Sequence, residues 1–215
     1  MPKHWILIAI CVLWTNIAQA VEMGCHAPGY QLLRSVVRVT GDDGSRASGV
    51  VIAHNRIATA AHVVAASRTV YIEFGNAIYN AQLLRIDKER DLALLAAPTM
   101  DLWPIPVSSR LPIYWQPVWA VGYPLARDQV AEPGFFERYF NGGLQTTADV
   151  QSGQSGGALV SCEKGRHVVL GIIRGYGAYP DGKGGYDRLP GFSVSVAAAD
   201  LSQFVGSEVE LAYIN

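Results

Sequence analysis

The sequence predicts an all-β fold, and three observations lead to this prediction. Short runs of β-branched and other apolar residues recur along the chain, clusters of glycine, aspartate and asparagine separate them, and prolines divide them into two sets. The chain has 215 residues, of which 50% are hydrophobic and 16% charged, and this composition is typical of a folded globule. Short strands at this spacing favour a sandwich or a barrel.

The first set of apolar runs predicts six strands. They are expected at Val36–Val39, Gly49–Ala53, Ile57–Ala61, Val70–Phe74, Ala77–Ile86 and Leu92–Ala96. Turn-forming residues lie between them at Gly41–Gly44, His54–Asn55 and Gly75–Asn76. Prolines then recur from Pro98 to Pro117, and this stretch is predicted to connect two halves of the molecule.

A second strand set and a short closing helix are predicted after the prolines. The strands are expected at Val118–Val121, Leu144–Thr146, Ala158–Ser161, His167–Ile173 and Phe192–Val196. Apolar residues at helical spacing predict the helix within 196–205. Two stretches, 123–143 and 176–189, are predicted as loops that either select substrates or partners, or cover a small satellite core.

The segment Ser152–Leu159 holds a serine, Ser155, between glycines just before an apolar run. Serine becomes a nucleophile only with a base to take its proton, and glycines allow backbone N–H groups to converge on an oxyanion. The segment also fits the nucleophile elbow of α/β-hydrolases, in which an acid and then a histidine follow the serine. Here only His167 follows, with Glu163 the one carboxylate before it, so the order and spacing exclude that elbow.

A base and an acid are therefore expected upstream of the serine. His62 ends one apolar run, and Asp91 immediately precedes another. His62, Asp91 and Ser155 occur in one of the known chain orders of a serine–histidine–aspartate relay.

With these motifs the sequence resembles the trypsin-like serine peptidases, and most closely the peptidase domain of their bacterial HtrA-like branch. The resemblance extends from about Leu33 to Phe204 and implies two six-stranded antiparallel β-barrels with an active site in the cleft between them. It rests on Ala47–Ile52, Thr59–Val64, Asp87–Leu95, Ala120–Pro124, Leu144–Thr146, Gly153–Leu159, Gly171–Ile173 and Gly191–Val194. The expected division is a signal peptide at 1–20, a tail and first barrel at 21–98, a connection at 99–117, and a second barrel with the helix at 118–215.

The resemblance implies a serine endopeptidase that forms an acyl-enzyme on Ser155, with His62 as base and Asp91 orienting it. The N–H groups of Gly153 and Ser155 would form the oxyanion hole. In some members of the family, an aspartate directly before the nucleophile pairs with a new N-terminus that zymogen cleavage frees. Here that position is the uncharged Gln154, so activation by zymogen cleavage is not expected. The alternatives are a non-catalytic binding protein and an esterase on the same scaffold.

The resemblance also places Asp149 at the floor of the primary specificity pocket and Gly191 in its wall. An unpaired carboxylate there would favour arginine or lysine before the cleaved bond, because an unpaired buried charge is costly. Alternatively, a neighbouring arginine such as Arg174 already pairs with Asp149, or the carboxylate lies in a solvated loop.

Residues 1–20 read as a secretory signal peptide, with Lys3, an apolar run from Trp5 to Trp14 and an Ala18-Gln19-Ala20 ending. The apolar run is shorter than the about 20 residues that span a bilayer, which argues against a membrane anchor. Cleavage after Ala20 predicts a secreted or periplasmic protein. There Cys25 and Cys162 form either a disulfide or two free thiols.

The net charge of −1 gives no basic excess to suggest nucleic acid. The other histidines, His4, His26, His54 and His167, lack the spacing of a metal site, so neither a metal nor a cofactor is expected. Protein or peptide substrates are the expected partners, with no stable membrane anchor after signal cleavage.

Overall fold

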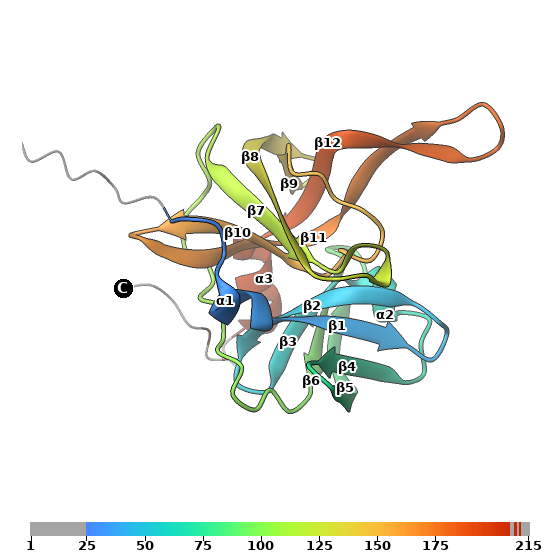
Figure 1. Ribbon diagram of the computed structural model, residues 1–215, viewed down its shortest axis with the longest axis vertical. Coiled ribbons are helices and arrows are strands. Elements are labelled where there is room, and N and C mark those ends of the chain that lie inside the picture. The colour runs from blue at the N-terminus through green and yellow to red at the C-terminus, as the bar shows by residue number, and fades with distance from the viewer. Residues whose placement is uncertain (1–24, 207–208, 210, 212–215) are drawn as a thin grey trace, which may run out of the picture.

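The computed structural model describes residues 25–206, 209 and 211, which form two closed six-stranded barrels (Figure 1). Every strand pairing inside the barrels is antiparallel. The all-β, two-barrel prediction is therefore confirmed. The predicted signal peptide, residues 1–20, lies outside the described residues.

The first barrel contains the strands before the proline-rich connection. They are β1 (Val36–Gly41), β2 (Arg46–Ala53), β3 (Arg56–Thr59), β4 (Val70–Phe74), β5 (Ala77–Asp87) and β6 (Leu92–Ala96). Around the barrel they follow the order β1, β2, β3, β6, β5, β4. All six strands predicted from the first half of the sequence are present.

The second barrel follows the connection. Its strands are β7 (Pro117–Gly122), β8 (Val130–Phe140), β9 (Gly143–Thr146), β10 (Ala158–Glu163), β11 (Arg166–Pro180) and β12 (Tyr186–Ala197), in the order β10, β11, β12, β9, β8, β7. Short helices flank the barrels: α1 (Tyr30–Arg34), α2 (Ala61–Val64), the 3₁₀ turn η1 (Pro124–Ala126) and the predicted closing helix, α3 (Ala198–Val205). Among the described residues, no helix is long and apolar enough to span a bilayer.

Three expectations about local structure were wrong. The stretch predicted as a loop at 123–143 contains β8, a strand with a single buried residue, and Pro133 and Gly134 further weaken its strand signal in the sequence. The stretch at 176–189 is a hairpin in which β11 and β12 continue beyond the barrel (Figure 1). The strand expected to reach Ala61 ends at Thr59, because Ala60 caps the one-turn helix α2, which begins at Ala61.

Apolar side chains gather in three buried clusters. One contains residues of β1–β6, including Val37, Val51 and Leu95, and fills the first barrel. A second contains residues of β7–β11, including Leu144 and Leu159, and fills the other barrel. Because side chains alternate along a strand, the neighbours of these residues face outward from each barrel.

The third cluster joins the two barrels and α3. Its members are buried residues from both sets of strands, and they include Val36, Val50, Ile52, Leu92, Leu94, Val121, Ala158, Val160, Val169, Ile172, Leu201 and Phe204. Strands such as β2 and β10 are therefore apolar on both faces, one toward a barrel interior and one toward the other barrel. This explains why the sequence shows continuous apolar runs in these strands instead of alternation.

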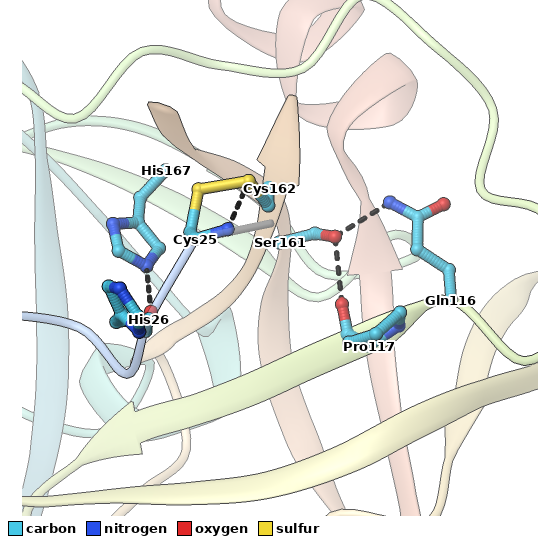
Figure 2. Close-up of a disulfide and its surroundings, with 7 residues drawn as sticks. All are labelled: Cys25, His26, Gln116, Pro117, Ser161, Cys162 and His167. Carbon is cyan, nitrogen blue, oxygen red and sulfur yellow. Dashed lines mark hydrogen bonds between the residues drawn. A yellow bond between two sulfur atoms is a disulfide. The ribbon is translucent and has the colours of Figure 1, made fainter. Parts of the chain in front are cut away.

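A disulfide joins the start of the described chain to the second barrel (Figure 2). Cys25 pairs with Cys162 of β10, with their Cα atoms 5.5 Å apart, so the alternative of two free thiols does not apply. Beside this bond, His167 Nε2 lies 3.0 Å from the His26 carbonyl oxygen, and Ser161 Oγ donates a hydrogen bond to the Pro117 carbonyl. The disulfide and the contact between His26 and His167 hold the N-terminal segment against β10 and β11, while the Ser161 bond joins β10 to β7.

We predict that replacing both Cys25 and Cys162 by serine lowers the free energy of unfolding by about 2–4 kcal/mol. The bond closes a loop with a sequence separation of 137 residues, which restricts the unfolded chain. Denaturant unfolding with and without a thiol reductant measures the effect. The reductant should destabilise the natural chain and leave the double variant unchanged; equal stability of the natural chain in both conditions would contradict the prediction.

Candidate active site

His62 and Asp91 meet at one end of the first barrel. His62 lies on α2, and Asp91 lies in the turn that leads into β6. The imidazole Nδ1 is 2.9 Å from Asp91 Oδ2 and 3.0 Å from Oδ1, and the backbone N–H of His62 donates to Oδ1 at 2.9 Å. The carboxylate therefore fixes both the ring and the backbone of the histidine, and leaves Nε2 facing away from it.

Asp91 is nearly buried, and its backbone has a φ of 61°. Aspartate adopts this left-handed conformation more readily than most residues. A guanidinium from the other barrel also reaches the carboxylate, because Arg174 Nε of β11 lies 3.5 Å from Oδ2. Asp91 is thus paired with His62 from its own barrel and with Arg174 from the other.

Ser155 lies in the loop between β9 and β10, beside the first barrel. Its carbonyl accepts a hydrogen bond from Ser48 N of β2 at 2.9 Å. The next residue, Gly156, has a φ of 80°, and a Cβ there would collide with Thr59 and with the Ser48 carbonyl. Only glycine allows this close approach, which brings Ser155 toward the segment that carries His62.

The Ser155 hydroxyl donates to the Arg174 carbonyl at 3.2 Å. Across the part of the chain that the structure describes, no hydrogen bond joins Ser155 Oγ to the imidazole of His62. The structure therefore links His62 with Asp91 directly and holds the serine hydroxyl on a neighbouring carbonyl. A rotation about the Ser155 Cα–Cβ bond is needed to point the hydroxyl elsewhere.

The turn before Ser155 presents two unused N–H groups. Gln154 N donates to the Gln151 carbonyl at 3.1 Å, and Gly153, third in this turn, has a φ of 94°, as a type II turn requires. The buried Gln154 side chain reinforces the turn, since its Oε1 accepts from Gln151 N at 2.8 Å. Within residues 25–206, neither Gly153 N nor Ser155 N donates to another group of the chain.

Ser48 connects this turn to the first barrel, although the sequence analysis assigned it no role. Its buried Oγ donates to the Gly153 carbonyl at 2.8 Å and accepts from Tyr123 N at 3.0 Å. Ser48 belongs to the motif Ala47–Ile52, but its bonds are non-local, so the sequence alone did not reveal them.

The side chain of Tyr123 also contacts the first barrel, since its hydroxyl donates to the Val36 carbonyl at 3.2 Å. Burial raises the pKa of this hydroxyl, and the nearby Arg38 guanidinium partly offsets the increase.

Asp149 is paired, and its partner is Arg188 of β12. Arg188 Nη1 donates to Asp149 Oδ1 and, at 3.3 Å, to the Val150 carbonyl. Gly191 N also lies 3.4 Å from Asp149 Oδ1. The suggestion that Arg174 fills this position was wrong, because Arg174 pairs with Asp91. Arg188 was missed because it lies in the stretch that was expected to be a loop.

No group of three or more histidine, cysteine, aspartate or glutamate side chains within the described residues is arranged to hold a metal ion.

The comparisons with known proteins agree with this architecture. The model of the trypsin-like peptidase domain matches residues 47–172, which is more than half of the chain, so the chain belongs to this family. Two strains of Mycobacterium tuberculosis have similar curated proteins, the serine proteases Rv3671c and MT3772, each 29% identical to this chain over 143 residues. The match covers 60% of this chain but only 35% of each relative.

Solved structures show the same fold. The active form of the Rv3671c protease has a TM-score of 0.71 and 22% identity, covering 86% of this chain and 85% of that one. The serine endoprotease of Yersinia pestis has a TM-score of 0.68 and 24% identity, covering 83% of this chain and 66% of that one.

We predict that Ser48→Ala destabilises the protein by about 1–3 kcal/mol, because it leaves Tyr123 N and the Gly153 carbonyl without their partner. Chemical denaturation measures the change. Ser195→Ala is the matched control, since Ser195 Oγ is also buried but has no hydrogen-bond partner among the described residues. Equal losses of stability in the two variants would contradict a structural role for the Ser48 hydroxyl.

Proposed function

We propose that this chain is an exported serine endopeptidase of the bacterial HtrA-like branch, with Ser155 as nucleophile, His62 as general base and Asp91 as orienting acid. The observation that carries the proposal is the pair of hydrogen bonds between His62 Nδ1 and the Asp91 carboxylate, 2.9 and 3.0 Å long, in a protein of this family. An aspartate in this position holds the imidazole in the tautomer that accepts a proton at Nε2.

The proposed reaction begins when the Ser155 hydroxyl leaves the Arg174 carbonyl and turns to His62 Nε2. The serine oxygen attacks the peptide carbonyl carbon while its proton passes to Nε2. The oxyanion that forms accepts hydrogen bonds from Gly153 N and Ser155 N, the two N–H groups that the turn leaves unused.

The second half of the reaction returns the enzyme to its starting state. The imidazolium gives its proton to the leaving amine as the carbon–nitrogen bond breaks, which leaves an acyl ester on Ser155. Water then loses a proton to His62 and attacks this ester, and the serine recovers its proton when the acid product departs. The proposed chemistry uses three side chains, the two backbone N–H groups and water, and it requires no metal or cofactor.

We predict that Ser155→Ala reduces turnover of a protein substrate by about 10⁴-fold or more. The natural chain without residues 1–20 should react with a fluorophosphonate at Ser155 without any further cleavage, because Gln154 is uncharged and its turn is already hydrogen-bonded. Ser109→Ala, an exposed serine in the connection between the barrels, is the matched control and should keep full activity.

The outcomes separate the alternatives. A chain that folds but neither reacts with the fluorophosphonate nor cleaves protein would be a binding protein on a peptidase scaffold. A chain that reacts and cleaves esters but not peptide bonds would be an esterase. Activity retained in Ser155→Ala would refute the proposed nucleophile.

Export through a signal peptide at residues 1–20 is part of the proposal. The Cys25–Cys162 disulfide supports it, because such bonds persist in oxidising compartments outside the cytoplasm. The proposed mature chain then comprises a tail and first barrel at 21–98, a connection at 99–117, and a second barrel with the closing helix at 118–215; the first strand of that barrel, β7, begins one residue earlier, at Pro117.

We predict that the chain recovered from the periplasm or the medium begins at Val21. The reason is that the apolar segment and the Ala18-Gln19-Ala20 ending fit signal peptidase cleavage. Intact-mass analysis of that fraction measures where the chain begins. Replacing Ala20 by a bulky residue should leave the uncleaved chain in the cell. Recovery of an exported chain that still carries residues 1–20 would contradict the signal peptide.

The sequence analysis favoured a specificity for arginine or lysine before the cleaved bond, with the Asp149 carboxylate as the group that selects them. The observation that bears on it is the Asp149–Arg188 ion pair, which already supplies this carboxylate with a cation.

A further inference from the structure

The loop that carries Ser155 and the base of the β11–β12 hairpin face each other and are joined at successive points. At one end, Ser155 Oγ donates to the Arg174 carbonyl at 3.2 Å. In the middle, Ser152 Oγ lies 3.1 Å from Tyr176 Oη. At the other end, Asp149 contacts Arg188 and Gly191 N. The resemblance to trypsin-like peptidases implies that the substrate side chain before the cleaved bond enters between these two segments, toward the Asp149–Arg188 pair. For this entry the contact between Ser152 and Tyr176 must open.

The pair is held by the fold on both sides. Register pairs Arg188 of β12 with Ala178 of β11, so the hairpin fixes the position of the arginine. Arg188 Nη1 bonds both Asp149 Oδ1 and the Val150 carbonyl, which anchors the guanidinium across the loop. Both side chains remain partly accessible, with 31% of Arg188 and 42% of Asp149 exposed, so the pair can be reached from solvent.

A tethered cation is difficult for a substrate cation to replace. An exposed ion pair is itself worth only about 0–1 kcal/mol. However, a group attached to the same folded chain acts at an effective concentration on the order of millimolar or above, so a substrate at micromolar concentration competes poorly. The hairpin that projects beyond the second barrel in Figure 1 supplies this tether.

We propose that Arg188 is a specificity-determining residue: by pairing with Asp149 it cancels the charge beside the nucleophile, and the protease accepts uncharged side chains before the cleaved bond. This inference rests on the proposed function, because it assumes that Ser155 attacks a peptide. An incoming lysine or arginine finds the carboxylate occupied, and an incoming glutamate finds the guanidinium occupied. Either charge would lose water without gaining a partner, which is unfavourable.

The test is a cleavage profile over a peptide library with the natural full-length chain after export, Arg188→Gln, Asp149→Asn and the double variant. The natural chain should favour uncharged residues at the acyl side. Arg188→Gln should raise cleavage after arginine and lysine by about 10-fold or more relative to uncharged residues, since an unpaired carboxylate attracts a cation by at least about 1.4 kcal/mol at partly buried sites.

The remaining variants make the result specific. Asp149→Asn leaves Arg188 unpaired and should raise cleavage after glutamate and aspartate, while the double variant should return to uncharged residues. Arg166→Gln is the matched control, because Arg166 is an exposed arginine at the opposite end of β11 and its loss should leave the profile unchanged. Fluorophosphonate labelling of Ser155 in each variant reports whether the site is intact.

Two results would overturn the inference. One is a natural chain that already cleaves mainly after arginine or lysine. The other is an Arg188→Gln variant that labels normally at Ser155 but keeps the natural profile. A natural chain that does not label at all would instead refute the proposed function, so the two failures are distinguishable.

Discussion

The candidate site depends on the apolar contact between the two barrels. His62 and Asp91 belong to the first barrel and Ser155 to the second, so neither barrel contains the whole set. The contact buries large side chains such as Ile52, Leu92 and Ile172, each of which stabilises it by about 1.5–3 kcal/mol. Helix α3 adds Leu201 and Phe204 to the same cluster. The segment after β12 thereby helps to hold the two halves together.

Polar contacts set the register of this interface, which apolar packing alone fixes poorly. Ser48 bonds to Ser155 through its backbone N and to Gly153 through its hydroxyl. Gly122 and Gly156 leave room for this approach, since a Cβ on either would crowd Ser48. The turn that presents the Gly153 and Ser155 N–H groups is therefore positioned from the first barrel as well as by its own hydrogen bonds.

The first barrel was predictable because its strands carry a strong apolar signal on one or both faces. Strand β8 was not predictable, because Pro133 and Gly134 interrupt the apolar pattern in its sequence. Gly134 lies close to Ala148, and this contact is visible only in three dimensions. The candidate site shows the same division. Local motifs pointed to His62, Asp91 and Ser155. The contacts of Ser48, Arg174 and Arg188 join residues that are distant in sequence, and no local motif reveals such pairings.

The position of the Ser155 hydroxyl on the Arg174 carbonyl is compatible with the proposed relay on energetic grounds. Leaving that carbonyl costs about one ordinary hydrogen bond, a net 0.5–1.5 kcal/mol, and the hydroxyl recovers a comparable bond at His62 Nε2. Enzymes lower reaction barriers by about 8–23 kcal/mol, so this cost is small in comparison. The Arg174 guanidinium meanwhile pairs with Asp91 at 3.5 Å. One residue of β11 thus contacts Ser155 through its backbone and Asp91 through its side chain. It couples the second barrel to the first at the point where the chemistry is proposed to occur.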